Sequence, residues 1–244
     1  TPPTPTPSAS PTATATPTPS PTVPPSPTPS PTAKLPEAVY VFDFQTDPGW
    51  STESDWAFGV PLGQGGCPAP TPEEGCGDSY GNPAPSSGCT GENVYGYNLA
   101  GDYPDNLPAT YYLTTAPLDL SRAQGTYLRF RRWLNVEQAA NDHAYVQAST
   151  DGTTWTVLWA NPAGPGEAVL DAAWNDLSYN LAPIYDRASA LRLRWGMGRT
   201  DNIRRYSGWN LDDVEIWGIL DPSPSPTPRV ITPTPTATPT PTPL

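Results

Sequence analysis

The sequence has very few of the side chains that most enzymes use for nucleophilic or acid–base chemistry. His143 is the only histidine, and the chain has three cysteines and one methionine. The H-E-x-x-H, Walker A and G-x-G-x-x-G motifs are all absent. We therefore expect no catalytic residues and a protein that is not an enzyme. A carboxylate pair for glycoside hydrolysis stays open, because 24 acidic residues allow many pairs.

Basic side chains are also scarce. The chain has 12 lysines and arginines against 24 aspartates and glutamates, which gives a net charge of −12 at pH 7. A surface this acidic offers no electrostatic footprint for nucleic acid or for an anionic membrane. No apolar run is long enough to span a bilayer. We therefore expect neither nucleic-acid binding nor a membrane span.

Proline, by contrast, is abundant and unevenly distributed. Residues 1–33 contain only Thr, Pro, Ser, Ala and one Val, and residues 221–244 nearly repeat that composition. Proline fixes φ and removes an amide donor, so the pattern predicts two extended, polyproline-II-like tails around a domain of residues 34–220. Thr and Ser beside Pro are typical of O-glycosylated stalks. We expect O-glycans on the tail Thr and Ser residues; a plain linker is the alternative.

One short segment of the C-terminal tail favours a β-strand. Val230 and Ile231 interrupt the proline repeats there. Such a segment can add as a strand to an exposed sheet edge of a neighbouring molecule. A random interruption is the alternative.

Strict alternation predicts several β-strands. Residues 191–195 alternate leucine with arginine, and residues 127–134 place Leu128, Phe130 and Leu134 on one face. Asp151-Gly152 predicts a hairpin between residues 143–149 and 154–159. Further strands are expected near residues 39–44, 56–58, 93–97, 110–115, 173–180 and 209–217. About ten short strands, with no helical period, predict an all-β, two-sheet antiparallel jelly-roll sandwich.

Arginine provides eleven of the twelve basic residues. Several of these arginines lie in the strand-like segments, namely Arg129, Arg131, Arg132, Arg192 and Arg194. Because a guanidinium group can fork onto a carboxylate, we interpret them as sheet-surface salt bridges. A binding patch is the alternative.

The three cysteines lie close together in a long loop of residues 59–92. They predict one disulfide and one unpaired thiol. Pairing Cys67 with Cys76 closes a short loop, and we expect this disulfide to staple the segment. Cys89 is then buried, free or bonded to another chain.

Aromatic residues are numerous, with nine Trp and twelve Tyr. Exposed rings stack on the faces of sugars, which suggests a set of glycan contacts in the N-terminal half. These are Trp50, Trp56, Tyr95, Tyr97 and Tyr103. The alternative is that the rings fill a β core, as their strand propensity favours.

Four motifs follow one another in order: VFDFQTDPGW, YLTTAPLDLS with YLRFRRWLNV, NDHAYVQASTDGTTWTVLW, and GWNLDDVEIWG. In this order, residues 39–218 resemble the MAM-like jelly-roll accessory modules of bacterial secreted peptidases, including C-terminal domains of the immune-inhibitor-A type. The resemblance implies a two-sheet jelly roll, an extracellular or cell-surface accessory role, and often a structural cation near the first and last strands. It implies no catalytic function.

The same resemblance suggests ligands for that cation. Asp212 and Asp213 match the closing Asp pair of such modules, and Asp142 leads the DHAYV strand. Gln45 stands where a glutamate is usual. Calcium is the natural ion for all-oxygen ligands. The alternative is that these aspartates cap turns or pair with arginine.

Two functions fit these observations. The first is a non-catalytic extracellular structural or adhesive module, a repeating subunit of a cell-surface or filamentous assembly. Its partners would be other copies of itself or neighbouring domains, and its tails would be spacers or interlocking arms. The second is a carbohydrate- or substrate-binding accessory module of a larger secreted hydrolase or peptidase. A structural subunit predicts buried aromatic residues, whereas a binding module predicts an open groove lined by Trp or Tyr.

Overall fold

The computed structural model describes residues 34–67 and 76–221. These residues form twelve strands and their connections, and the described ranges contain no helix. They therefore hold no helix long and apolar enough to cross a membrane. The two predicted tails, with Val230 and Ile231, lie outside the described residues.

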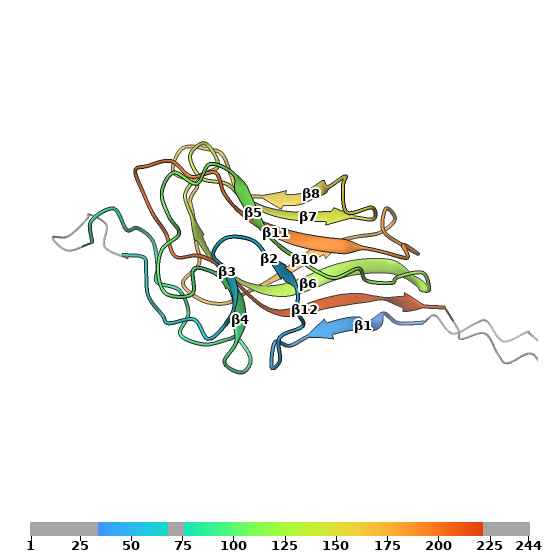
Figure 1. The fold of residues 1–244 in the computed structure, drawn as a ribbon. Helices are drawn as coiled ribbons and strands as arrows, with labels where there is room; N and C mark the ends of the chain where they lie inside the picture. Colours follow the sequence, from blue (N-terminus) through green and yellow to red (C-terminus); the bar gives the residue numbers. More distant parts are fainter. Residues whose placement is uncertain (1–33, 68–75, 222–244) are drawn as a thin grey trace, which may run out of the picture. The chain divides into compact units, whose positions relative to one another are not determined.

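The strands form two antiparallel sheets that pack as a sandwich (Figure 1). The large sheet has seven strands: β10 (Asn175–Asn180), β6 (Ala123–Val136), β12 (Gly208–Leu220), β4 (Val94–Tyr97) and β3 (Trp56–Gly59) in that order, with β1 (Glu37–Phe42) on β12 and β9 (Val169–Leu170) on β6. The small sheet has five strands in the order β2 (Ser51–Thr52), β5 (Thr110–Thr114), β11 (Arg192–Gly198), β7 (Ala144–Ser149) and β8 (Thr156–Ala160). The predicted all-β sandwich is confirmed.

Alternate residues of each central strand face the core between the sheets. In β6, Leu128, Phe130 and Leu134 are buried, as their spacing predicts. In β11, Leu193 and Trp195 are fully buried, while Arg192 and Arg194 alternate with them. A period of two places every second side chain on the same face. The buried rows of both sheets meet in one hydrophobic core.

The predicted hairpin connects β7 to β8. Gly152 has a φ of +73°, a conformation that glycine adopts without steric cost. The Asp151 carboxylate accepts hydrogen bonds from the amides of Thr153 (2.8 Å) and Thr154 (2.7 Å). This aspartate therefore fixes the turn that its sequence predicts.

The described parts of the long loop of residues 59–92 contact the large sheet through hydrogen bonds and close packing. Its predicted disulfide is confirmed, since Cys67 is bonded to Cys76 and Cys89 is an exposed free thiol. The indole of Trp133 donates to the carbonyl of Pro83 (3.0 Å). Gly66 has a φ of +61°, and a Cβ there would lie 2.2 Å from the carbonyl oxygen of Asn82. This close approach requires a glycine.

The two ends of the described domain lie side by side. β1 and β12 pair in antiparallel fashion, with Glu37 opposite Gly218 and Phe42 opposite Val214. The Lys34 ammonium group donates to the carbonyl of Leu220 (2.7 Å). The chain therefore enters and leaves the described domain at the same end of the paired strands β1 and β12 (Figure 1).

Candidate functional site

The five aromatic residues predicted to contact a glycan are buried. Trp50 is 6% exposed and Trp56 is 3% exposed, and the three tyrosines are exposed by 1% or less. Trp50 stacks on Tyr95 and on Trp195 of the small sheet, with ring centroids 5.4 and 5.6 Å apart. The prediction is wrong for Trp50, Trp56, Tyr95, Tyr97 and Tyr103, because these rings fill the interior between the sheets.

A different aromatic group lies on the outer face of the small sheet. The rows that face away from the core include Tyr112 of β5, Arg194 of β11 and Gln147 of β7, since the residue that follows each of them in its strand is fully buried. Register places Arg194 opposite Gln147 on one side and Thr114 on the other. Residues from three adjacent strands therefore meet at this point.

Arg194 lies between two aromatic rings. Its guanidinium carbon is 3.7 Å from the ring centroid of Tyr112 and 3.9 Å from that of Trp155. Its Nε donates to Oε1 of Gln147 (2.6 Å). Cation–π attraction and planar stacking favour arginine in this setting. We call Tyr112, Arg194 and Trp155 the aromatic–arginine stack; all three side chains are half-buried.

The stack depends on a glycine and a turn near it. Gly196 pairs with Tyr112 in the sheet, and a Cβ at this glycine would lie 2.8 Å from the tyrosine ring. The missing side chain leaves room for Tyr112 to lie along the sheet. Trp155 comes directly after the Asp151-Gly152 turn, which directs its indole onto the same face.

A hollow of about 450 Å³ adjoins the stack. Its lining includes Arg194 and Trp155 from the stack, together with Arg192, Glu53 and Asp151. Glu53 accepts from the Tyr112 amide (2.9 Å). The amides of Thr154 and Thr153 hold the pKa of the Asp151 carboxyl well below its usual range. The hollow therefore combines an aromatic face with two guanidinium donors and two carboxylate acceptors.

The two arginines of this face differ from those of the large sheet. Arg129, Arg131 and Arg132 form the predicted salt bridges, with Glu215 (3.8 Å), Asp213 (3.9 Å) and Asp171 (2.9 Å), respectively. Among the described residues, neither Arg192 nor Arg194 has such a carboxylate partner, so the salt-bridge prediction is wrong for both. The guanidinium groups of Arg192 and Arg194 therefore have N–H donors that no carboxylate of the described residues occupies, whereas those of the large-sheet arginines face carboxylates.

The four predicted metal ligands do not form one group. The turn of residues 88–91 lies against Gln45, Asp212 and Asp213: Thr90 donates to Asp212 through its amide (2.9 Å) and to Asp213 through its hydroxyl (2.6 Å). Asp142 lies elsewhere, beside Glu137 and Asp201. Asp212 pairs with Arg131 of β6, six residues before Glu137, which is roughly 20 Å along a strand. The prediction that Asp142 shares a site with Asp212 is therefore wrong.

Glycines allow the remaining three predicted ligands to approach the 88–91 turn. A Cβ at Gly91 would lie 2.3 Å from the Gln45 side-chain amide. A Cβ at Gly88 would lie 2.8 Å from Oδ2 of Asp212 and 2.5 Å from the carbonyl oxygen of Thr90. Gly88 therefore packs closely against Asp212, and a calcium ion at these residues stays a prediction. Burial raises the pKa of Asp212 to about 6.

A serine-hydrolase pattern also occurs in the chain, at Gly77-Asp78-Ser79-Tyr80-Gly81. A nucleophile elbow needs a strand before its serine and a helix after it. Ser79 instead lies in a turn, where its amide donates to the carbonyl of Cys76 (3.1 Å), and no helix follows in the described residues. The ring of His143 stacks on Tyr145, 5.9 Å away, and burial lowers the pKa of its imidazole. The pattern therefore lacks the geometry of a hydrolase.

No family model matches the chain. Its sequence is 26% identical over 182 residues to Bacillopeptidase F of Bacillus subtilis (strain 168), a match that covers 72% of this chain and 10% of that protein. The chain therefore spans about a tenth of the length of this relative. The similarity relates it to one region of a much larger peptidase.

Three solved structures resemble the fold at low TM-scores. The K1 cleaved adhesin domain of Lys-gingipain from Porphyromonas gingivalis W83 has a TM-score of 0.40 and 16% identity, covering 75% of this chain and 96% of that one. A carbohydrate-binding module of the β-sandwich superfamily gives 0.38 and 14%, covering 72% and 60%. The CBM2 module of the evolved Dit of Lactobacillus casei BL23 phage J-1 gives 0.34 and 10%, covering 77% and 98%.

Proposed function

We propose that this chain is a non-catalytic, extracellular accessory module that binds a glycan through the outer face of its small sheet. The observation that carries this proposal is the aromatic–arginine stack beside the 450 Å³ hollow. Ligand sites combine an apolar, often aromatic, surface with a few convergent polar groups. The indole of Trp155 would pack against the face of a sugar ring, and Arg192 and Glu53 would bond its hydroxyl groups.

The charges around the hollow favour an uncharged sugar. Arg192 and Arg194 contribute two positive charges, and Glu53 and Asp151 contribute two negative charges. The lining is therefore neutral overall, and a neutral oligosaccharide would not have to overcome a local charge. The strongly acidic remainder of the chain would repel polyanionic glycans at long range.

An accessory role agrees with two further observations. The sequence relative is a peptidase, and the chain corresponds to about a tenth of its length. The Cys67–Cys76 disulfide is typical of proteins that fold in an oxidising, extracellular environment. Binding to a surface glycan would hold a larger enzyme near its substrate.

The other sequence-based expectations stay predictions. These are the O-glycans on the tails, association with other copies through Val230 and Ile231, a filamentous assembly, the MAM-like family, and a calcium ion held by Gln45, Asp212 and Asp213. The burial of Trp50 and Trp56 agrees with a structural subunit. The aromatic–arginine stack favours a binding module, and we therefore place binding first.

The experiment that tests this function is a binding screen of the full chain. The chain is applied to an array of neutral and acidic polysaccharides, and its affinity for the best neutral ligand is measured by calorimetry. We expect Trp155→Ala to weaken that affinity about 30-fold, the equivalent of a hot-spot residue worth roughly 2 kcal/mol.

A matched control exists on the opposite sheet. Trp217 also carries an arginine over its ring, with Arg129 5.8 Å from the centroid. We expect Trp217→Ala to leave glycan affinity unchanged. Equal losses in both variants, or no retention of any polysaccharide by the wild-type chain, would refute the proposed function.

A further inference from the structure

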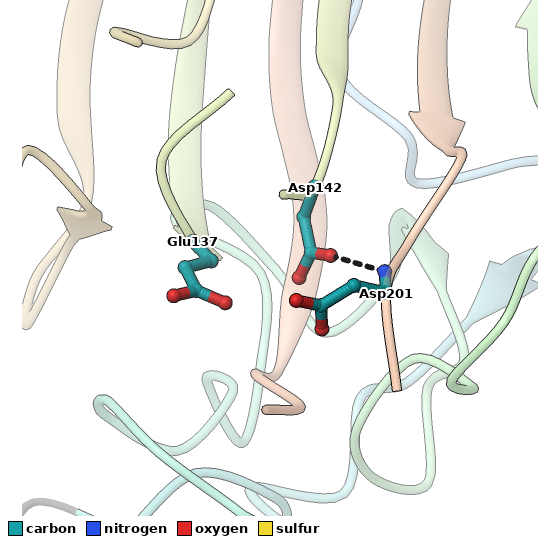
Figure 2. Close-up of side chains that lie close together, drawn as sticks. All are labelled: Glu137, Asp142 and Asp201. Atoms are coloured by element: carbon teal, nitrogen blue, oxygen red, sulfur yellow. Dashed lines mark hydrogen bonds between the residues drawn. The ribbon is translucent and has the colours of Figure 1, made fainter. Parts of the chain in front are cut away.

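Three carboxylates lie close together where the β6–β7 and β11–β12 connections pass from one sheet to the other. Glu137 directly follows β6, Asp142 lies just before β7, and Asp201 lies between β11 and β12. One oxygen of each lies within 4.8 Å of an oxygen of the other two. Figure 2 shows the three carboxylates facing one another. We call these residues the acidic cluster.

Two members of the acidic cluster are almost entirely removed from solvent. Asp142 is 0% exposed and Glu137 is 5% exposed, and Asp201 is half-buried. Oδ1 of Asp142 accepts from the Asp201 amide (3.0 Å), and its Oδ2 accepts from the Tyr103 hydroxyl. Both Asp142 oxygens are therefore held in fixed directions.

Glu137 lacks such support. Its Oε2 is buried and has no hydrogen-bond partner among the described residues. A buried polar atom without a partner loses its hydration and gains nothing in return, and a charged one loses more. The Glu137 carboxylate faces the other two carboxylates (Figure 2), and its unpartnered oxygen leaves an acceptor available for a ligand.

The charge of the acidic cluster is also unbalanced. Its single ion pair in the described part of the chain joins Oε1 of Glu137 to Nη1 of Arg204 at 3.4 Å. The arginine side chain is 46% exposed, so solvent screens much of its charge. Three carboxylates and one guanidinium leave a net charge of −2.

We propose that Glu137, Asp142 and Asp201 bind a divalent cation, with calcium as the best match. Oxygens within 4.8 Å of one another can all lie on a sphere of about 2.3–2.6 Å radius around one Ca²⁺ ion. A hollow of about 460 Å³ reaches Asp201 from the surface, which gives the ion an entry path and room for water ligands. The +2 charge of the ion would balance the −2 formal charge of the acidic cluster and Arg204.

This site is separate from the one that the family resemblance implies. That site involves Gln45, Asp212 and Asp213 near the 88–91 turn, roughly 20 Å away along β6. It would hold the first strand to the last. A cation in the acidic cluster would instead join both crossovers between the sheets, because β6 and β12 belong to the large sheet and β7 and β11 to the small one.

The test counts calcium ions bound to the full chain. Protein stripped with EGTA is dialysed against ⁴⁵CaCl₂, and the bound ions per chain are measured for the wild type and for Glu137→Gln. We expect the variant to bind one ion fewer, or to bind that ion at least about tenfold more weakly. Asp213→Asn, which alters only the other predicted site, should keep this ion.

Thermal unfolding supplies a second readout. Without calcium, Glu137→Gln should be at least as stable as the wild type, because it removes one of three carboxylate charges that repel one another, and the half-exposed Arg204 can be hydrated instead. With calcium, the wild type should gain stability by mass action and the variant should gain less. Asp201→Asn at the half-exposed member repeats the test if Glu137→Gln does not fold. Wild-type calcium binding in both variants, or no binding by the wild-type chain, would overturn the proposal.

Discussion

The ion pair between Arg132 and Asp171 is the least exposed of the ion pairs in the described residues, and we expect its loss to lower stability the most. Asp171 receives Nε (2.9 Å) and Nη2 (3.1 Å) of Arg132, and its Oδ2 also accepts from the amide of Leu134 (2.9 Å). The side chains of Arg132 and Asp171 are only 13% and 10% exposed. Removing one partner of such a pair leaves a charge that is neither hydrated nor paired.

We predict that Asp171→Asn lowers the free energy of unfolding by about 3–5 kcal/mol. In a domain of this size each kcal/mol changes the Tm by about 2–4 °C, so the Tm should fall by roughly 6–20 °C. The Arg132 guanidinium also lies over the ring of Trp159, 5.4 Å from its centroid, and this contact remains in the variant. The loss is therefore expected toward the lower end.

The matched control is Asp176→Asn. Asp176 of β10 pairs with Arg131, the neighbour of Arg132 in β6, but the Asp176 side chain is 66% exposed. An exposed pair contributes about 0–1 kcal/mol. The free energy of unfolding of both variants is measured in urea. The same measurement on Arg132→Met and on the Arg132→Met/Asp171→Asn double variant gives the interaction energy between Arg132 and Asp171. The double variant should lose less than the sum of the single losses, because it contains no unpaired buried charge. Equal costs for Asp171→Asn and Asp176→Asn, or additive single losses, would refute this reasoning.

Two further predictions concern a turn and a loop. Because hydrogen bonding lowers the pKa of Asp151 in the folded state, its contribution to stability is complete above about pH 4–5 and decreases as the pH falls toward the folded value. Urea unfolding between pH 5 and 2 should therefore show a smaller acid loss in Asp151→Asn than in the wild type, and identical profiles would contradict this. Gly66 and Gly77 have φ values of +61° and +58°, but a Cβ would clash with Asn82 only at Gly66. Gly66→Ala should cost more stability than Gly77→Ala, which bears only the backbone strain of roughly 1–3 kcal/mol; equal melting temperatures would contradict the clash.

The positions of the strands along the chain are largely visible in its sequence because most strands have one buried face. Residues 191–195 alternate leucine with arginine, and the structure buries the apolar row of β11 and leaves the arginine row outside. The two strands that the pattern missed, β2 and β9, have two residues each. Two residues cannot show a period, so these strands depend on the neighbours with which they pair.

The aromatic–arginine stack on the outer face of the small sheet was only partly predictable. Period two places Arg192 and Arg194 on the outer face, which was a usable signal. The position of Tyr112 over Gly196 depends on the register between β5 and β11, which local sequence does not specify. The burial of Trp50 and Tyr95 had no sequence signal, because an aromatic ring suits the face of a sugar and a β core equally well.

Of the acidic cluster, the sequence pointed only to Asp142, through the family resemblance. Glu137 and Asp142 are separated by five positions, but Asp201 comes from a connection 59 residues after Asp142. Only the packing of the two crossovers brings the third carboxylate to the other two. The orphaned oxygen of Glu137 is likewise a property of the folded chain.

The pairing of β1 with β12 has a mechanical consequence. Since Glu37 lies opposite Gly218 and Lys34 donates to the Leu220 carbonyl, both ends of the described domain lie at the same end of the β1–β12 pair. A force that pulls Lys34 and Asp221 apart would break the hydrogen bonds between β1 and β12 one after another, starting from this end. It would not load all of them at once in shear. We expect β1 to peel away at low force while the β6–β12 ladder stays intact. Under load, such a module would extend in steps and dissipate mechanical energy before the rest of the domain unfolds.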